Sequence, residues 1–376
     1  MTLLSRIWKN DTVYQEPVCF SEDAFGAPLG GTLIYRPSRV LEAVSWDGQI
    51  RYEEGLDYQV SGSRILLTKQ SRIPFLNRSV YIKPYTGQAE TAWLRLPGGT
   101  EYAQIFPDIY RYQILVTYRH EERWEQPLLQ DQSARLSRSF RLLNEGSEFH
   151  LVFYGDSITA GWEASGCDEL AVDLMTLEDC HAVVNHPPYM PSWAELVTDA
   201  LRRQFPNCPV HKYNRAAGGS TTGWGRLHAA ALVPPCDPDL VVLGFGMNSL
   251  QDPPEQYVSE IRQIIQDIRR SHPLCEFLLL SPMVPNPEIA GFQNNALSDQ
   301  QNALRDLAGR EAGIALAEVH SLFLALMERG KEYLALTGNC INHPNDFSVR
   351  IYAQSILDTL GISCTDQRTD RSSDPP

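Results

Sequence analysis

A serine and a histidine that lie far apart in the chain have the residue types that a nucleophile and its general base require. Ser157 follows an apolar run through Gly155 and Asp156, and the glycine permits a sharp turn that lifts the hydroxyl out of a buried strand. His343 precedes a proline and a predicted helix, a place where a histidine can act as general base. Each residue also has a structural explanation, Ser157 as a helix cap and His343 as a surface histidine.

Two further segments carry groups that could bind an oxyanion. The segment "YNRAAGGSTTGWG" places Gly218 and Gly219 just past a short strand, where a glycine brings a backbone N–H close to a ligand. Asn248 follows the apolar run "VVLGFGM" and can donate a side-chain N–H into a crevice. Taken alone, these patterns also fit a flexible loop and a turn. We further expect the residues after Ser157 to begin a helix whose first N–H groups face a developing anion.

The elements that must position these groups are visible in the hydrophobic pattern. Near-continuous apolar runs of strand length alternate with amphipathic helical patterns such as 253–273 and 345–361, which predicts a parallel sheet covered on both faces. Ligand sites in such sheets lie at the carboxyl ends of the strands, so the four segments are expected to meet there. The predicted strands are 149–154, 239–245, 276–281 and 314–319.

The chain divides by pattern into four parts. Residues 1–120 contain short alternating runs, for example "GTLIYRP" at 31–37, and predict an all-β domain of jelly-roll or sandwich-like type. Residues 121–148 are polar and predict a connector, and residues 149–362 carry the alternating strands and helices. Residues 363–376 are polar and predict a disordered tail.

Composition bounds the functions that fit. The 376 residues carry a net charge of −14 and no run of basic residues, which argues against a nucleic-acid partner. No apolar run is long enough for a membrane span, and the first residues lack the pattern of a signal peptide, so we expect a cytoplasmic protein. Eight scattered cysteines predict reduced thiols; a Cys167–Cys180 bridge would require export. No clustered ligand pattern predicts a metal, and no cofactor is expected.

Four segments, read in chain order, resemble the conserved blocks of the SGNH/GDSL hydrolase superfamily: "GDSITAG", "NRAAGG", "GMNS" and "NHPND". The resemblance spans about 149–361 and implies a flavodoxin-like, three-layer α/β/α domain that hydrolyses esters. It implies that Ser157 is the nucleophile and His343 the general base. It also implies an oxyanion hole made by the backbone N–H groups of Ser157 and Gly219 and by the side-chain amide of Asn248.

Two positions depart from the superfamily pattern. Ser249 stands where the third block commonly has an aspartate, and Cys340 stands three residues before the histidine, where the acid of the triad is usual. A neutral thiol cannot stabilise an imidazolium as a carboxylate does. The favoured interpretation is a Ser–His dyad in which a backbone carbonyl near Cys340 or Ile341 orients the imidazole of His343. An acid from elsewhere in the chain, or an inactive domain, are the alternatives.

A β domain followed by such a hydrolase domain resembles two-domain bacterial carbohydrate O-acetyl esterases, which implies deacetylation of an oligosaccharide or another small-molecule ester. Asp156, Trp162, Trp224 and Met247 are candidates to line the substrate site, although core packing explains the two tryptophans equally well. The long segment 167–193 is predicted to cover part of the site. The alternatives are a general short-chain carboxylesterase, lipase or thioesterase, and a catalytically dead glycan-binding protein. Whether the chain forms a homo-oligomer stays open.

Overall fold

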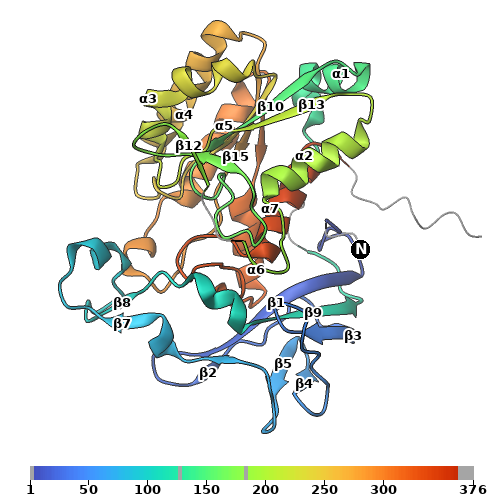
Figure 1. Cartoon of the computed structure of the whole chain (residues 1–376), viewed down its shortest axis with the longest axis vertical. Coiled ribbons are helices and arrows are strands. Elements are labelled where there is room, and N and C mark those ends of the chain that lie inside the picture. The colour runs from blue at the N-terminus through green and yellow to red at the C-terminus, as the bar shows by residue number, and fades with distance from the viewer. Residues whose placement is uncertain (1–3, 126–128, 182–184, 363–376) are drawn as a thin grey trace, which may run out of the picture.

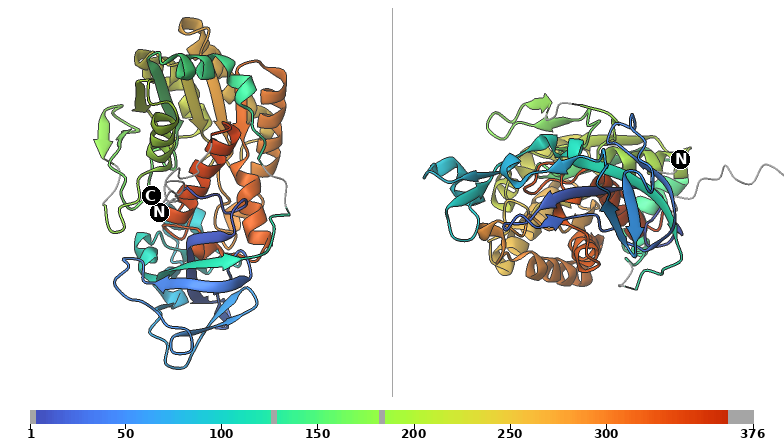
Figure 2. Two further views of the ribbon diagram at one scale, coloured as in Figure 1. Left: turned by 90° about the vertical axis from the view of Figure 1, so that its right-hand side faces the viewer. Right: turned by 90° about the horizontal axis from the view of Figure 1, so that it is seen from below.

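The protein consists of an N-terminal β region at one end and an α/β region at the other (Figures 1 and 2). The computed structural model describes residues 4–125, 129–181 and 185–362, so the predicted disordered tail at 363–376 lies outside the described residues. In this described part, every helix is too short or too polar to cross a membrane.

Five parallel strands form the central sheet of the α/β region, in the order β13-β10-β14-β15-β16. All four apolar runs predicted as strands are confirmed, and the second strand of the sheet along the chain lies at its edge, which is the flavodoxin-like order. The order reverses between β10 and β14, and open sheets bind ligands at such a reversal. The strands are β10 (Phe149–Gly155), β13 (Val210–Asn214), β14 (Leu240–Gly244), β15 (Glu276–Leu280) and β16 (Ile314–Ala317).

Helices cover both faces of this sheet, and alternate strand residues belong to two separate hydrophobic cores. Val152 and Tyr154 of β10 pack in the core beneath α3, α4 and α5, whereas Leu151 and Phe153 pack in the core shared with α1, α2, α6 and α7. Burial on both faces explains why the strands read as continuous apolar runs. The helices are α1 (Ser137–Glu145), α2 (Trp193–Gln204), α3 (Thr222–Leu232), α4 (Pro254–Ser271), α5 (Leu297–Arg310), α6 (Val319–Glu328) and α7 (Asp346–Thr359).

The N-terminal region is built on a second five-stranded sheet whose long pairings are antiparallel, which confirms that a β domain precedes the α/β region. Two small hairpins, β4–β5 and β7–β8, extend from it. The sheet contains β1 (Thr12–Glu22), β2 (Pro28–Leu29), β3 (Pro37–Val44), β6 (Phe75–Leu76) and β9 (Gln113–His120); the hairpins contain β4 (Tyr58–Ser61), β5 (Arg64–Leu67), β7 (Ile82–Pro84) and β8 (Glu101–Ala103).

The predicted strand at 31–37 is wrong, because β3 begins only at Pro37. Gly31 has a φ of +90°, and the backbone N–H of Ile34 donates to the carboxylate of Glu16 (2.9 Å) rather than to a neighbouring strand. The alternating pattern therefore reflects an irregular segment whose apolar side chains are buried.

Tertiary contacts join the two regions through β1 and through the residues that precede it. The Lys331 ammonium lies 2.6 Å from a Glu16 carboxylate oxygen, and both side chains are fully buried. In α7, the Asp358 carboxylate accepts from the Trp8 indole (2.7 Å) and the Lys9 ammonium (2.9 Å). One hydrophobic core runs from the β region to α7, so the domain limits drawn from the sequence stay a prediction.

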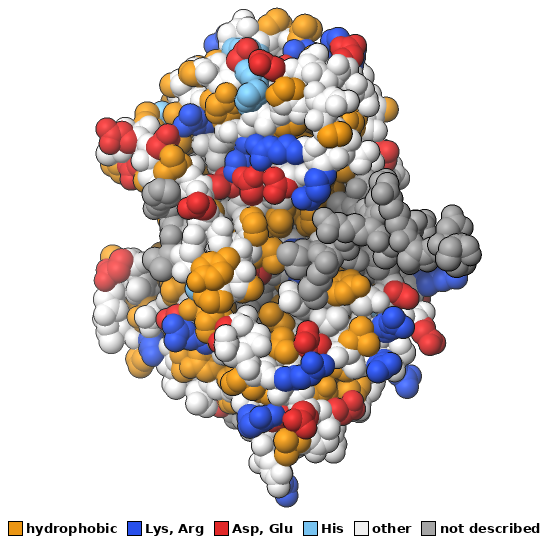
Figure 3. Space-filling view, turned by 45° about the vertical axis from the view of Figure 1, so that its right-hand side comes forward, with side chains coloured by type: hydrophobic (Ala, Val, Ile, Leu, Met, Phe, Trp, Pro, Cys, Tyr) orange, Lys and Arg blue, Asp and Glu red, His pale blue; other side chains and the backbone are white. Residues whose placement is uncertain are grey.

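Acidic and basic side chains are interspersed with hydrophobic ones on the face of the molecule drawn in Figure 3.

Candidate active site

The structure brings Ser157 and His343 together at the carboxyl edge of the parallel sheet. Ser157 follows β10, and its Oγ lies 2.8 Å from Nε2 of His343, which comes from the loop before α7. Gly155 makes the turn after β10 possible, because a Cβ at this position would lie 2.3 Å from the carbonyl oxygen of Gly244. Both catalytic candidates are buried, with 3 % and 7 % of their surfaces exposed, so their hydrogen bond is largely shielded from water.

The residues after Ser157 form consecutive turns rather than the expected helix. The backbone N–H of Ala160 donates to Asp156 O (2.9 Å) and that of Trp162 to Ser157 O (3.0 Å), but the chain then departs from helical geometry at Gly161, where φ is +88°. The oxyanion donors therefore have to come from separate loops rather than from one helix N-terminus.

Asp156 and Met247, two of the candidates for lining the substrate site, are interior residues with 1 % of their surfaces exposed. The Asp156 carboxylate accepts from the backbone N–H groups of Ile158 (3.0 Å) and Met247 (3.3 Å). It thereby ties the turn that carries Ser157 to the loop after β14. Burial raises the pKa of Asp156 to about 6, against the opposing effect of the Ile158 hydrogen bond.

Gly219 and Asn248, the other two predicted oxyanion donors, follow β13 and β14, which flank β10 in the sheet. Gly219 has a φ of +76°, which favours glycine, and it is exposed. The exposed Asn248 donates one amide hydrogen to Ser220 O (3.0 Å), which leaves its second hydrogen free for a ligand. The loops after three neighbouring strands thus carry Ser157, Gly219 and Asn248, and their role as oxyanion donors stays a prediction.

We expect Asn248→Ala to lower kcat by about 10²–10³-fold, because removal of one oxyanion donor typically costs that much. KM is expected to change little, since the developing charge is absent from the bound ester. Steady-state kinetics on a small acetyl ester measure both constants. Asn144→Ala is the matched control, because Asn144 is exposed on α1. Retention of more than half of kcat in Asn248→Ala contradicts the assignment.

The two tryptophan candidates lie in different environments. The half-buried Trp162 ring lies edge-on to the imidazole of His343, with 5.6 Å between the ring centroids, and packs directly against Gly218. Trp224 lies on α3, where its ring is 4.6 Å from that of His228 and 6.4 Å from that of Tyr154. The structure therefore places Trp162, and not Trp224, beside the catalytic pair.

The segment 167–193 contains a hairpin, β11 (Leu170–Val172) and β12 (Asp179–His181), beside the loop after β13. The Leu174 side chain lies 3.8 Å from where a Cβ of Gly219 would be. Coverage of the site by this segment stays a prediction, and residues 182–184 lie outside the described part. The thiols of Cys167 and Cys180 are both free.

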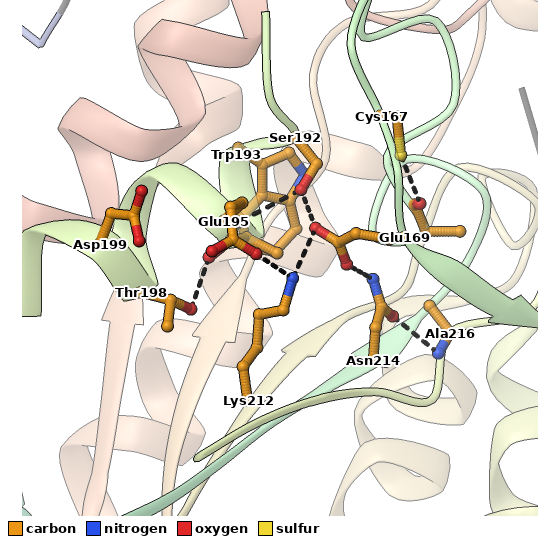
Figure 4. A network of polar contacts seen from close by, with 12 residues as sticks. Cys167, Glu169, Ser192, Trp193, Glu195, Thr198, Asp199, Lys212, Asn214 and Ala216 are labelled. Carbon is orange, nitrogen blue, oxygen red and sulfur yellow. Dashed lines mark hydrogen bonds and ion pairs between the residues drawn. The ribbon is translucent and has the colours of Figure 1, made fainter. Parts of the chain in front are cut away.

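A polar network behind the nucleophile's turn links it to β13 and α2 (Figure 4). Glu169 binds Ser192, which caps α2, and also binds Asn214 and Lys212 of β13. Asn214 in turn donates to Thr159 O (3.1 Å) and accepts from the backbone N–H of Ala216 (3.1 Å). The network therefore fixes the loops of Ser157 and Gly219 relative to each other.

The N-terminal region holds the loop that carries His343. The side-chain amide of Gln113, at the start of β9, donates to Leu334 O (2.7 Å) and Thr337 O (2.9 Å) and accepts from Asn345 (2.9 Å). Nothing in the sequence pattern signals this contact, because it joins residues more than 200 positions apart.

The backbone carbonyls expected to orient His343 are engaged elsewhere. Asn286 donates to Cys340 O (2.7 Å) and Tyr333 donates to Ile341 O (2.9 Å). The Cys340 side chain is fully buried in the main core, and burial raises the pKa of its thiol. In the described part of the chain, neither carbonyl forms a hydrogen bond with the imidazole.

Two residues that sequence reasoning missed lie at Nδ1 of His343 instead. The side-chain Nδ2 of Asn339 is 2.9 Å away, and a carboxylate oxygen of Glu163 is 3.7 Å away. Glu163 lies two residues after the end of the first block, so an acid near Ser157 was visible in the sequence. Its direction toward the imidazole depends on the turn geometry, which no spacing rule predicts.

One group of described side chains, Glu148, His150 and His211, is arranged so that it could hold a metal ion. These residues lie at the amino ends of β10 and β13, the edge of the sheet opposite Ser157. The group therefore has no part in the chemistry at the Ser157–His343 pair.

Comparison with known proteins matches residues 153–348, more than half of the chain, to the GDSL-like Lipase/Acylhydrolase family model. The structure resembles a two-domain esterase (CEX) active on acetylated mannans, with a TM-score of 0.47 and 19% identity over 64% of this chain and 56% of that chain. It also resembles the acetylxylan esterase Axe2 from Geobacillus stearothermophilus, with a TM-score of 0.44 and 16% identity over 58% of this chain and 96% of that chain. The chain thus aligns with little more than half the length of CEX. No curated protein sequence matches it.

Proposed function

The chain belongs to the GDSL-like lipase/acylhydrolase family, and from that premise we propose that it is a serine esterase for small acyl groups, with O-acetylated oligosaccharides as substrates. The observation that carries the proposal is the 2.8 Å contact between Ser157 Oγ and His343 Nε2 at the carboxyl edge of the sheet. Such a contact lets the imidazole take the proton of an attacking hydroxyl.

In the proposed reaction, Ser157 Oγ forms a bond to the acyl carbon while its proton moves to Nε2 of His343. The electron pair of the carbonyl moves onto the oxygen, which accepts from the backbone N–H groups of Ser157 and Gly219 and from the Asn248 amide. The electron pair on the oxygen then re-forms the carbonyl while the bond to the leaving alcohol breaks, and Nε2 gives the Ser157 proton to the departing alcohol oxygen. Water releases the acyl group by the same steps, with His343 again accepting the proton.

Large side chains around the donors support a short acyl group. Trp162 packs against Gly218, and Leu174 lies beside Gly219, so both limit the space next to the proposed oxyanion. The half-buried indole of Trp162 also offers a flat apolar face on which a sugar ring can stack. The carbohydrate part of the proposal rests on these contacts and on the order of the two regions in the chain.

Hydrolysis of an acyl-ester series tests the proposal. We expect kcat/KM to be highest for acetyl esters, to fall with each lengthening of the acyl chain, and acetate to be released from acetylated xylo- and manno-oligosaccharides. Rates that rise from acetyl to hexanoyl esters would support a general carboxylesterase or lipase instead. Absence of hydrolysis across the whole series would leave a glycan-binding protein as the remaining alternative.

A further inference from the structure

A histidine that acts as general base needs a hydrogen-bond acceptor at Nδ1, because Nδ1 carries a proton when Nε2 receives one. The nearest neighbour of Nδ1 in this structure is a donor. The Asn339 side-chain oxygen accepts from the backbone N–H groups of Ile341 (2.9 Å), Asn342 (3.0 Å) and His343 (3.2 Å). These three contacts fix the orientation of the amide, so its Nδ2 faces Nδ1 of His343 at 2.9 Å.

This arrangement selects the wrong tautomer for catalysis. When Nδ1 accepts from Asn339, the single proton of the neutral imidazole resides on Nε2 and points at Ser157 Oγ. That nitrogen then has no lone pair with which to take the serine proton. The active form must therefore place the proton on Nδ1, and an acceptor has to replace the contact with Asn339.

Glu163 is the one carboxylate within 4.0 Å of the imidazole among residues 4–125, 129–181 and 185–362, with its oxygen 3.7 Å from Nδ1. It comes from the turn that also carries Ser157, and its φ of +67° directs the side chain toward the loop of His343. Gly338 makes room for it, because a Cβ there would lie 2.6 Å from Cβ of Glu163. The Glu163 carboxylate thus lies just beyond hydrogen-bonding distance of Nδ1.

We propose that Glu163 is the positioning acid of this site, which accepts the Nδ1 hydrogen of His343 in place of the missing aspartate. Its carboxylate holds the Nδ1–H tautomer before attack and stabilises the imidazolium after the Ser157 proton has moved to Nε2. No proton passes to Glu163, and Asn339 withdraws while the contact exists. The proposal rests on the esterase function proposed above and names what orients its general base.

Few charged groups surround this contact. Asp156 belongs to the turn on the Ser157 side of the imidazole, and the attraction between Asp156 and His343 lowers the pKa of Asp156, although burial has the larger, opposite effect. Asp346, Arg350, His186 and Tyr110 line a cavity that Glu163 and Gly338 also border. Burial has the largest effect in raising the pKa of the Cys340 thiol, and the Glu163 carboxylate is close enough for its charge to raise that pKa further. One-fifth of the Glu163 side chain is exposed, so a small anion can reach this position from solvent.

Kinetics of Glu163→Gln and Glu163→Ala test the proposal on acetyl esters. We expect kcat to fall by about 10³-fold, since loss of the acid of a triad costs up to about 10⁴-fold, while KM changes little. The acidic limb of the kcat/KM profile should move to lower pH, because the imidazolium loses a negative neighbour. Asp168→Asn is the matched control, because it removes one carboxylate from an exposed position of the same loop.

Two rescue experiments separate positioning from mere structural support. Formate should restore activity to Glu163→Ala in a saturable manner and leave the wild type and Asp168→Asn unchanged. Asn339→Asp should restore much of the activity lost in Glu163→Gln, because it puts a carboxylate oxygen where the amide nitrogen now lies, 2.9 Å from Nδ1. Its other oxygen keeps the three backbone contacts of the loop.

The outcomes distinguish the two proposals. Glu163→Gln with at least half of wild-type kcat and an unmoved acidic limb overturns the role of Glu163, as does a loss that neither formate nor Asn339→Asp relieves. If the wild type hydrolyses no ester, the proposed function fails, yet the imidazole titration remains measurable by NMR. The midpoint of that titration should lie at lower pH in Glu163→Gln than in the wild type, and equal midpoints overturn the inference.

Discussion

Replacement of Ser157 by alanine is expected to lower kcat for acetyl-ester hydrolysis by about 10⁵–10⁶-fold, the loss typical of a removed serine nucleophile. Without Oγ no covalent acyl-enzyme can form, and His343 Nε2 loses the partner that lies 2.8 Å away. The oxyanion donors remain, which leaves a residual rate above that of water alone. Initial rates at high enzyme concentration measure this residual rate. Mass spectrometry should find an acetyl adduct on the protein only when Ser157 is present.

Ser79→Ala serves as the control, because Ser79 is an exposed serine of the N-terminal region, remote in sequence from all four blocks. It should hydrolyse acetyl esters at the wild-type rate. A Ser157→Ala protein that keeps more than about one per cent of kcat is incompatible with nucleophilic catalysis by this residue. Equal thermal unfolding midpoints of the two variants would show that the loss is chemical.

Replacement of Lys331 by methionine is expected to destabilise the protein by about 3–5 kcal/mol, because it leaves a buried carboxylate without its counter-charge. The Lys331 ammonium is fully buried and contacts Glu16 (2.6 Å), Thr32 O (3.1 Å) and Pro17 O. After the substitution Glu16 retains only the Tyr118 hydroxyl (2.6 Å) and the Ile34 N–H (2.9 Å). Urea unfolding followed by circular dichroism measures the change in the free energy of unfolding.

The double variant Glu16→Gln with Lys331→Met should recover part of this loss, since it removes both buried charges together. Lys9→Met is the matched control, because Lys9 is about half exposed and its partner Asp358 keeps its ion pair with Arg6. We expect a cost of about 0–1 kcal/mol for it. If Lys331→Met costs no more than Lys9→Met, the buried pair does not hold the two regions together.

Four strands of the central sheet, β10, β14, β15 and β16, were predictable because they are buried on both faces and therefore leave uninterrupted apolar runs in the sequence. The edge strand β13 is only partly buried and leaves no such run. The secondary-structure predictions were wrong where a contact from elsewhere in the chain, or a local turn, replaces the regular backbone hydrogen bonds. Glu16 takes the N–H of Ile34 and ends the expected strand at 31–37, and turns interrupt the expected helix after Ser157. A local pattern cannot reveal that a partner lies elsewhere in the chain.

The Ser157–His343 pair was predictable from four ordered sequence blocks. The residues that hold or approach His343 were not. Gln113 reaches the loop of His343 from another region, and Glu163 approaches the imidazole only because the turn after Ser157 bends as it does. The residue that the sequence offered instead, Cys340, packs into the core. Motifs therefore identified the two side chains that meet at the edge of the sheet, whereas the groups around them depend on tertiary contacts.

The contacts of Trp8 and Lys9 with Asp358 impose an order on biosynthesis. The two partners are about 350 residues apart, so the first segment leaves the ribosome long before α7 is made. Domains generally fold as units during synthesis, from the N-terminal side onward. Here the apolar surface that the N-terminal region shares with α7 in the common core stays uncovered until α7 has been made, so the β region can complete its packing only late in synthesis.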